Sequence, residues 1–230
     1  MKQENTKENK NTLMQGWAAV WPVCVGYIPI GIAFGVLARK AGLTPLEIGL
    51  MSLFVFAGSS QFIAVSMLSA GATAASIILT TFIVNIRHLL MSSALAVFLG
   101  DSDRKKLSLF AYGVTDESFA INLARFREGG WDLNRSLVVN HIANMAWVAS
   151  TVIGAYGGQF IPERAFGIDY ALVAMFICLL IFQIRGRKHL ITAILAGVLS
   201  VIFSLIIPGN IYVVLASVLA ATLMLAFKRL

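Results

Sequence analysis

The sequence predicts an all-α, polytopic integral membrane protein, and two observations carry this prediction. First, 58% of the 230 residues are hydrophobic and only 13% are charged, whereas a soluble domain usually carries about 25% charged residues. Second, the apolar residues gather into long runs, and a helix needs about 20 consecutive apolar residues to cross a bilayer. So little polar surface cannot cover a soluble globule, and we therefore expect the chain to lie in lipid.

Eight apolar runs are candidate membrane spans. They cover residues 17–38, 46–69, 73–99, 107–124, 134–156, 170–184, 189–207 and 210–227. The sixth run is short and can pair with the seventh as a shallow hairpin, so we expect seven or eight transmembrane helices. We expect residues 1–14 to form a polar tail of mixed charge. The apolar run that follows is too long for a signal peptide and lacks a cleavage site, so we expect it to be a retained first span. We expect residues 15–230 to form a single transmembrane domain.

The distribution of charge predicts orientation and excludes one class of partner. Lys and Arg lie in the short connections between apolar runs and form no basic stripe interleaved with aromatic residues, so we expect no nucleic-acid partner. With eight spans and an internal N-terminus, 11 of these residues fall inside and 6 outside, with the loop 101–106 as the main exception. This bias predicts that both termini are cytoplasmic. The two cysteines form no metal-ligand or redox spacing, so we expect no metal and no cofactor.

Two polar interruptions predict broken helices and an internal duplication. The stretch FVFAGSSQF (54–62) resembles FAYGVTDESF (110–119), since each has aromatic residues, a small residue, a polar triplet and then Phe. A Val-Asn pair follows each stretch, at 84–85 and 139–140. Paired polar interruptions are typical of transporters that are built from duplicated units with discontinuous helices.

Arg87 is the most costly residue in the predicted spans. An arginine at the middle of a membrane helix costs at least about 2.5–3.5 kcal/mol and usually faces the protein interior or a water-filled cavity. Asp116 and Glu117 are the acidic residues that fall in the middle of a span. We therefore predict an ion pair between Arg87 and one of them. The pair can be purely structural, or it can open so that a substrate carboxylate replaces the acid.

Other polar residues in the predicted spans have both a structural and a functional interpretation. On an ideal helix Asn85 and His88 lie within about 60° of each other, whereas Arg87 points about 160° away from Asn85. His88 is either a hydrogen-bonded interior histidine or a proton carrier. Gly58–Gln61 either permit close helix packing or offer helix-end amides to a ligand. Asn140 and Asn144 share a helix face and either join helices or line a cavity.

The chain resembles the AzlC family, the large subunits of bacterial branched-chain amino acid exporters. Three stretches carry the resemblance, which extends over roughly residues 15–215: PVCVGYIPIGIAFGVLARKAGLTPLEIGLMSLFVFAGSSQFIAVSML, TTFIVNIRHLLMSSAL and GVTDESFA. The resemblance implies a permease of the cytoplasmic membrane and not an enzyme. It also implies a small AzlD-type subunit as the partner. The implied substrates are leucine, isoleucine, valine and sometimes methionine, and the implied driving force for export is the proton motive force.

A zwitterionic substrate needs an anion-binding and a cation-binding group in one cavity. We expect Arg87 and the amides at Gly58–Gln61 to hold its carboxylate, and Asp116 or Glu117 to hold its ammonium or a coupling proton. Phe56, Phe62 and Trp147 are candidates to receive the branched side chain. The predicted substrate-binding residues are Gly58, Ser59, Ser60, Gln61, Asn85, Arg87, Asn140 and Asn144, and the predicted proton-coupling residues are His88, Asp116 and Glu117.

Two other classes of function remain open from the sequence. The first is an intramembrane serine hydrolase, in which Ser60 is the nucleophile and His88 or His141 is the base. The second is a membrane scaffold that transports nothing.

Overall fold

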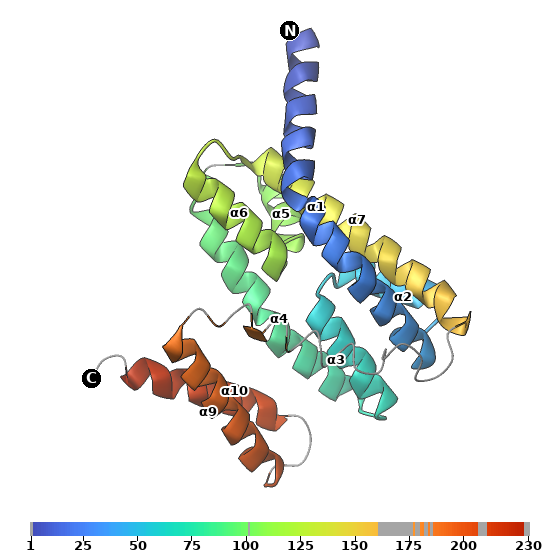
Figure 1. Cartoon of the computed structure of the whole chain (residues 1–230), viewed down its shortest axis with the longest axis vertical. Helices are drawn as coiled ribbons and strands as arrows, with labels where there is room; N and C mark the ends of the chain where they lie inside the picture. Colours follow the sequence, from blue (N-terminus) through green and yellow to red (C-terminus); the bar gives the residue numbers. More distant parts are fainter. Residues whose placement is uncertain are drawn as a thin grey trace.

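The computed structural model describes residues 2–100, 102–160, 177, 180, 181, 184, 186–206 and 211–227. Regular structure in these residues is helical, which confirms the predicted fold class (Figure 1). Among them, α1, α4, α7 and α9 are long and apolar enough to cross a membrane. The elements are α1 (Lys2–Lys40), α2 (Pro45–Phe54), α3 (Gly58–Ser69), α4 (Ala74–Ala96), α5 (Arg104–Tyr112), α6 (Asp116–Glu128), α7 (Leu133–Gly157), the 3-10 turn η1 (Gly158–Phe160), α9 (Arg187–Ser204) and α10 (Ile211–Phe227).

Helices α1 and α7 pack side by side and run parallel. Gln15 accepts a hydrogen bond from Arg135 near the start of α7, and a Cβ on Gly35 would lie 2.6 Å from the backbone nitrogen of Ala155 near its end. The contact points advance together along both helices, so both begin at the same end of the molecule. We call this end the first end, and the opposite one the second end. The polar tail predicted for residues 1–14 continues α1 as helix from Lys2, and Figure 1 shows it projecting beyond the other helices.

Helices α5 and α6 form a hairpin that begins and ends at the first end. Lys106 Nζ, at the start of α5, donates a hydrogen bond of 3.2 Å to Asn134 Oδ1 at the start of α7. Near the end of α6, the ring of Phe126 stacks on Phe98, which follows α4, with 5.3 Å between centroids. The predicted span 107–124 is therefore broken into two half-helices that enter and return, and it does not cross the molecule.

Helices α2 and α3 form a second hairpin at the second end. With 23 residues α4 is about 35 Å long, enough to cross a bilayer core of about 30 Å. The C-terminal turn of α4 lies at the first end of the molecule. Its N-terminal turn therefore lies at the second end, where α1 also ends. The chain between these points is the α2–α3 hairpin, and Gln61 donates to Ser52 across it at 3.2 Å. The predicted span 46–69 is thus also a broken helix.

The two hairpins make an inverted repeat. The unit α2–α3–α4 is a hairpin followed by a crossing helix, and so is the unit α5–α6–α7, but the units start from opposite ends. The breaks fall at residues 55–57 and 113–115, inside the two stretches that the sequence comparison paired. The predicted broken helices are confirmed, and the topology supports the predicted duplication, with the two units inverted.

Local chemistry explains where each half-helix starts and stops. Thr115 caps the start of α6, and its side chain forms a reciprocal capping box with Ser118. Helix α2 begins with a capping box between Thr44 and Glu47. Before α3, Phe56 takes a φ of +40°, a left-handed conformation that a bulky residue adopts only when its surroundings hold it there.

Helices α9 and α10 pack against each other and match the predicted spans 189–207 and 210–227. The predicted span 170–184 lies mostly outside the described residues. The count of seven or eight crossings for the whole chain therefore stays a prediction, while residues 2–160 contain three crossing helices and two hairpins.

Candidate functional site

The tips of the two hairpins meet near the middle of the molecule. Tyr112, at the end of α5, donates a hydrogen bond from its hydroxyl to the carbonyl oxygen of Leu53, near the end of α2. The ring of Phe56 lies 6.5 Å from the ring of Tyr112. Helices α4 and α7 pass beside these tips. Backbone that is not helical is tolerated at this depth only where it is buried in protein or lines a cavity.

Arg87, near the middle of α4, joins the N-termini of α3 and α6. Its Nη1 lies 3.0 Å from Asp116 Oδ2, and its Nη2 donates to Ser59 Oγ. The side chains of Arg87 and Asp116 are 29% and 30% exposed, so the described helices do not close over the pair completely. The ion pair predicted for Arg87 is present, and its partner is Asp116 and not Glu117.

The two tips carry opposite electrostatic character. Helix α3 begins after Ala57, which gives no side-chain cap in the described structure, so the first N–H groups of α3 and their partial positive charge are left to other acceptors. Helix α6 is capped by Thr115 and has Asp116 and Glu117 in its first turn. One tip therefore presents donors and the other presents carboxylates, with the guanidinium of Arg87 between them.

Glu117 faces a different partner from Asp116. Tyr27, on α1, donates a hydrogen bond of 2.7 Å to Glu117 Oε2, and its hydroxyl also lies 3.0 Å from Thr115 Oγ1. Tyr27 is only 7% exposed. Tyr27 was not among the predicted site residues, because nothing in a single sequence places α1 beside α6. The one available signal was that a tyrosine hydroxyl inside an apolar run needs a hydrogen-bond partner.

His88 holds the tip of the α5–α6 hairpin. Its Nδ1 lies 2.8 Å from the carbonyl oxygen of Val114, and this acceptor requires that Nδ1 carries the proton. Within the described residues, His88 Nε2, Arg87 Nε and Asn85 Oδ1 are buried without a hydrogen-bond partner. Buried polar atoms without partners are uncommon, because each costs free energy. These atoms lie on two faces of α4, because Arg87 points about 160° away from Asn85, and each is a candidate to bind water or a polar ligand.

Gln61 and Ser60 stabilise the tip of the α2–α3 hairpin. Gln61 is fully buried, and its Oε1 accepts from Trp147 Nε1 at 2.9 Å and from the backbone nitrogen of Ala57 at 3.3 Å. Ser60 Oγ donates to the carbonyl oxygen of Ala57 at 3.0 Å. The side chains of these two predicted binding residues therefore already have protein partners, which favours a supporting role. Substrate binding by them stays a prediction.

The aromatic candidates lie mainly in the core. Trp147 is 3% exposed, and its ring stands 5.3 Å from Tyr27 and 6.0 Å from Phe34. A Cβ on Gly58 would lie 3.2 Å from the indole, so the glycine permits the start of α3 to approach it. Phe62 packs on Phe34 at 5.1 Å. Phe56, the third aromatic candidate, lies at the tip of the α2–α3 hairpin.

Asn140 joins helices, which is the structural one of its two predicted roles. Its Nδ2 donates to the carbonyl oxygen of Phe110 at 3.0 Å, and its Oδ1 accepts from Asn122 Nδ2 at 3.1 Å. Asn140 and Asn122 are both fully buried. Asn144 lies one turn further along α7, and its Nδ2 is 3.5 Å from the hydroxyl of Tyr112 at the hairpin tip.

The described residues offer no Ser–His pair for the hydrolase interpretation. Ser60 donates to Ala57, as described above, and His141 Nδ1 bonds to the carbonyl oxygen of Leu137 in its own helix at 2.7 Å. Since His88 bonds to Val114, neither histidine is hydrogen-bonded to Ser60 in the part of the chain that is described. The catalytic dyad that this interpretation requires is therefore not assembled here.

Two inverted units with broken helices, which meet at a charged site near the middle of the molecule, are typical of membrane transporters. The sequence profile of the family described as AzlC protein matches residues 22–161, so the chain belongs to the AzlC family. This membership supports a membrane transport role.

Relatives agree with this membership. The chain is 32% identical over 205 residues to the inner membrane protein YgaZ of Escherichia coli K12, covering 86% of this chain and 84% of the relative. It is 29% identical over 221 residues to the branched-chain amino acid transport protein AzlC of Bacillus subtilis 168, covering 91% and 85%. An uncharacterized membrane protein of Archaeoglobus fulgidus is 30% identical over 211 residues, covering 88% and 90%. No solved structure matches the chain significantly.

Proposed function

We propose that this protein exports branched-chain amino acids, namely leucine, isoleucine and valine and also methionine, across the bacterial cytoplasmic membrane. It does so as the large subunit of a two-component permease with a small AzlD-type subunit, and the proton motive force drives export. The family and the name of the Bacillus subtilis relative support the substrate class. The observation that carries the proposal is the Arg87–Asp116 ion pair between the hairpin tips.

The substrate inserts into this ion pair. The carboxylate of the amino acid takes the place of Asp116 at the guanidinium of Arg87, which binds carboxylates through two parallel hydrogen bonds. The first N–H groups of α3 lie next to Ser59 and add donors to the same carboxylate. Asp116 then pairs with the substrate ammonium. The exchange replaces one neutral pair with two, so no unpaired charge is left inside the membrane.

Glu117 carries the coupling proton. It lies next to Asp116 in sequence, but its hydrogen bond goes to Tyr27, so its protonation does not require the Arg87–Asp116 pair to open. His88 Nε2 is a second group that can hold the proton. This arrangement separates a substrate carboxylate site from a proton site within one turn of α6.

The hairpin topology supports a cytoplasmic first end. Between residues 2 and 160, nine Lys and Arg residues lie in segments at the first end and two, Arg39 and Lys40, lie at the second end. The loop 101–106 was the main exception to the positive-inside rule when residues 107–124 were treated as a span. With α5–α6 as a hairpin it joins the cytoplasmic side. A cytoplasmic C-terminus stays a prediction from the sequence.

Efflux of leucine tests the proposal. Cells that lack their own exporters are loaded with a leucine-containing dipeptide, and external leucine is followed with and without this protein and its small subunit. We expect faster efflux when both subunits are present, and a collapse of the difference when a protonophore is added. Equal efflux with and without the two subunits would contradict the proposal.

A further inference from the structure

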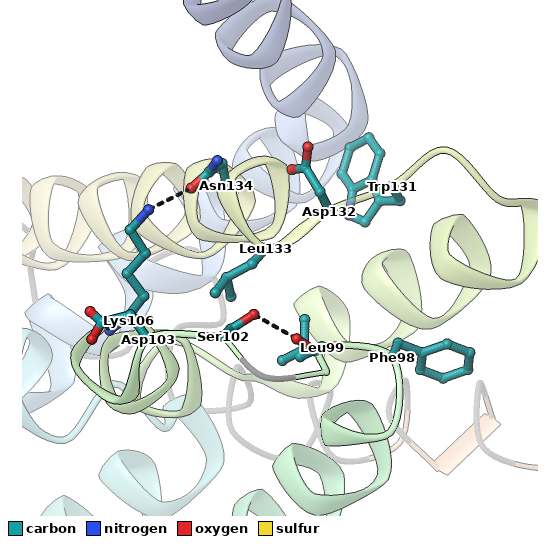
Figure 2. A pocket seen from close by; sticks show the side chains of 9 residues that line it. All are labelled: Phe98, Leu99, Ser102, Asp103, Lys106, Trp131, Asp132, Leu133 and Asn134. Atoms are coloured by element: carbon teal, nitrogen blue, oxygen red, sulfur yellow. Dashed lines mark hydrogen bonds between the residues drawn. The ribbon is translucent and has the colours of Figure 1, made fainter.

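An open cavity of about 420 Å³ lies at the first end of the molecule, and Figure 2 shows the side chains that line it. The end of α4, the starts of α5 and α7 and the loop before α7 border the cavity, and its remaining side is wide open. Phe98 lies 11 residues beyond Arg87 along the chain, so the cavity is about 16 Å from the ion pair along α4. Its volume is within the range of sites for small molecules.

The lining of the cavity combines a cationic group with an apolar floor. Lys106 Nζ donates one described hydrogen bond, to Asn134 Oδ1, and an ammonium has three donors. Figure 2 shows Leu99 and Leu133 below the gap between Lys106 and the indole of Trp131. Asp103 and Asp132 also border the cavity, but each caps a helix through its carboxylate. These groups suit a ligand that has a carboxylate and an aliphatic side chain.

An apolar cluster separates the cavity from the ion pair. Leu99 forms part of the cavity lining and also packs in a buried cluster with Leu95, Phe110 and Val114. Val114 belongs to the tip of the α5–α6 hairpin, where its carbonyl oxygen bonds to His88. A ligand in the cavity would therefore reach the ion pair only if this cluster opens.

A chain of hydrogen bonds links the wall of the cavity to the same hairpin. Trp131 Nε1 donates to Asn122 Oδ1 at 3.1 Å, and Asn122 Nδ2 donates to Asn140 Oδ1 at 3.1 Å. Asn140 Nδ2 then donates to the carbonyl oxygen of Phe110, in the last turn of α5, at 3.0 Å. A ligand that moves Trp131 would thus act on the hairpin tip through three hydrogen bonds, of which the second and third are buried.

We propose that this cavity is a second binding site, which takes a zwitterionic aliphatic amino acid from the cytoplasm before the amino acid reaches Arg87. The inference rests on the proposed function for its ligand and on the cytoplasmic first end for its direction. Lys106 binds the carboxylate, and Asp103, whose helix cap uses one carboxylate oxygen, binds the ammonium. Leu99, Leu133 and Trp131 contact the aliphatic side chain. The cluster around Leu95 and Val114 is the barrier that opens next.

Protection of a cysteine tests the site without a transport measurement. Cys24 and Cys178 are first replaced by alanine. Ser102→Cys is then introduced at the cavity. The control is Ser108→Cys, because Ser108 is exposed on α5 but does not line the cavity. The protein with its small subunit is labelled with a membrane-impermeant maleimide in inside-out vesicles. We expect leucine to slow labelling at residue 102 at least about fivefold, and glutamate or glycine to slow it much less. Labelling at residue 108 should not change.

The Arg87→Gln variant separates this site from the central one. We expect leucine to protect residue 102 in that variant as well, although transport is lost. If leucine protects residue 102 only when Arg87 is present, the effect comes from the central site and the inference is wrong. If leucine never protects residue 102 while leucine efflux is normal, the inference is wrong and the proposed function stands.

A pair of neighbouring lysines gives an independent check. Lys106→Gln removes the cationic group that lines the cavity, whereas Lys105→Gln removes an exposed charge that does not. We expect Lys106→Gln to raise the KM for leucine about fivefold, the effect of one exposed ion pair, with kcat little changed. Equal KM values for the two variants would contradict a role for Lys106 in binding.

Discussion

At the scale of single residues, the Arg87–Asp116 pair determines both the stability and the chemistry of the site. A buried pair contributes little net stability, because desolvation offsets most of the attraction, but removing one partner leaves a charge without compensation. Both side chains are about a third exposed, so this cost is smaller here than in a dry interior. Charge balance, and not either residue alone, is therefore the property that the fold requires.

We expect Arg87→Gln and Asp116→Asn each to destabilise the protein by about 1–3 kcal/mol, below the roughly 3–5 kcal/mol of a fully buried pair. The double variant should regain most of this stability, because it contains no unpaired charge, but it should not transport leucine. Thermal unfolding in detergent measures the stability, and dipeptide-loaded efflux measures the transport. The matched control is Arg87→Gln with Glu117→Gln, which should show no recovery. A double variant at Arg87 and Asp116 that still exports leucine at the normal rate would show that the pair is only structural.

Tyr27 and Glu117 test the separation of the proton site from the substrate site. We expect Tyr27→Phe and Glu117→Gln to slow net, proton-driven efflux about tenfold or more but to keep exchange of internal for external leucine, because exchange needs no net proton movement. Arg87→Gln should abolish both activities. Tyr27→Phe removes a hydroxyl that contacts both Glu117 and Thr115, which costs about 1–3 kcal/mol of stability, so folding should survive.

Tyr156→Phe, an exposed tyrosine on α7, is the control and should leave both activities unchanged. Loss of exchange in Tyr27→Phe, with a normal unfolding temperature, would place Tyr27 in the substrate site instead.

At the scale of elements, close backbone packing between α1 and α7 forms the frame on which the hairpins rest. A Cβ on Gly35 would lie 2.1 Å from the carbonyl oxygen of Thr151 and 2.6 Å from the nitrogen of Ala155, and backbone atoms cannot move aside as a flexible side chain can. Small residues at such contacts are typical of helix packing in membranes. A Cβ on Gly26, which lies on the same helix, would meet no described atom within 4 Å, so a methyl group fits there.

We expect Gly35→Ala to destabilise the protein by at least about 2 kcal/mol, because the added methyl group pushes α1 away from α7. Gly26→Ala should be neutral or stabilising by up to about 1 kcal/mol, since alanine favours helix and meets no neighbour. Unfolding temperatures of the two variants, measured side by side, check this difference. Similar values would mean that the α1–α7 contact is looser than described.

At the scale of the whole molecule, the hairpin topology makes a prediction that differs from a chain of simple crossings. Residues 102 and 134 flank the α5–α6 segment, and both lie at the first end. If α5 and α6 formed one crossing helix, these residues would lie on opposite sides of the membrane.

We expect Ser102→Cys and Asn134→Cys both to react with an impermeant maleimide only from the cytoplasmic side, and Ala70→Cys to react only from outside. Intact cells and inside-out vesicles provide the two sides. Labelling of residues 102 and 134 from opposite sides would contradict the hairpin, and labelling of both from outside would reverse the orientation.

The amino-acid sequence by itself determined the fold class, the two broken helices and the need of Arg87 for an acidic partner. Composition suffices for the first, because apolar runs of about 20 residues have the length of a membrane helix, whose backbone hydrogen bonds are all internal. Polar triplets at residues 59–61 and 116–118 mark the breaks. Only the tertiary structure decided that α2–α3 and α5–α6 turn back, because a crossing helix and a buried hairpin of equal length need the same apolar residues. It also decided that Asp116 pairs with Arg87 while Glu117 pairs with Tyr27. Neighbouring residues on a helix point about 100° apart, so the packing of α1 and α4 around α6 selects the partner of each carboxylate.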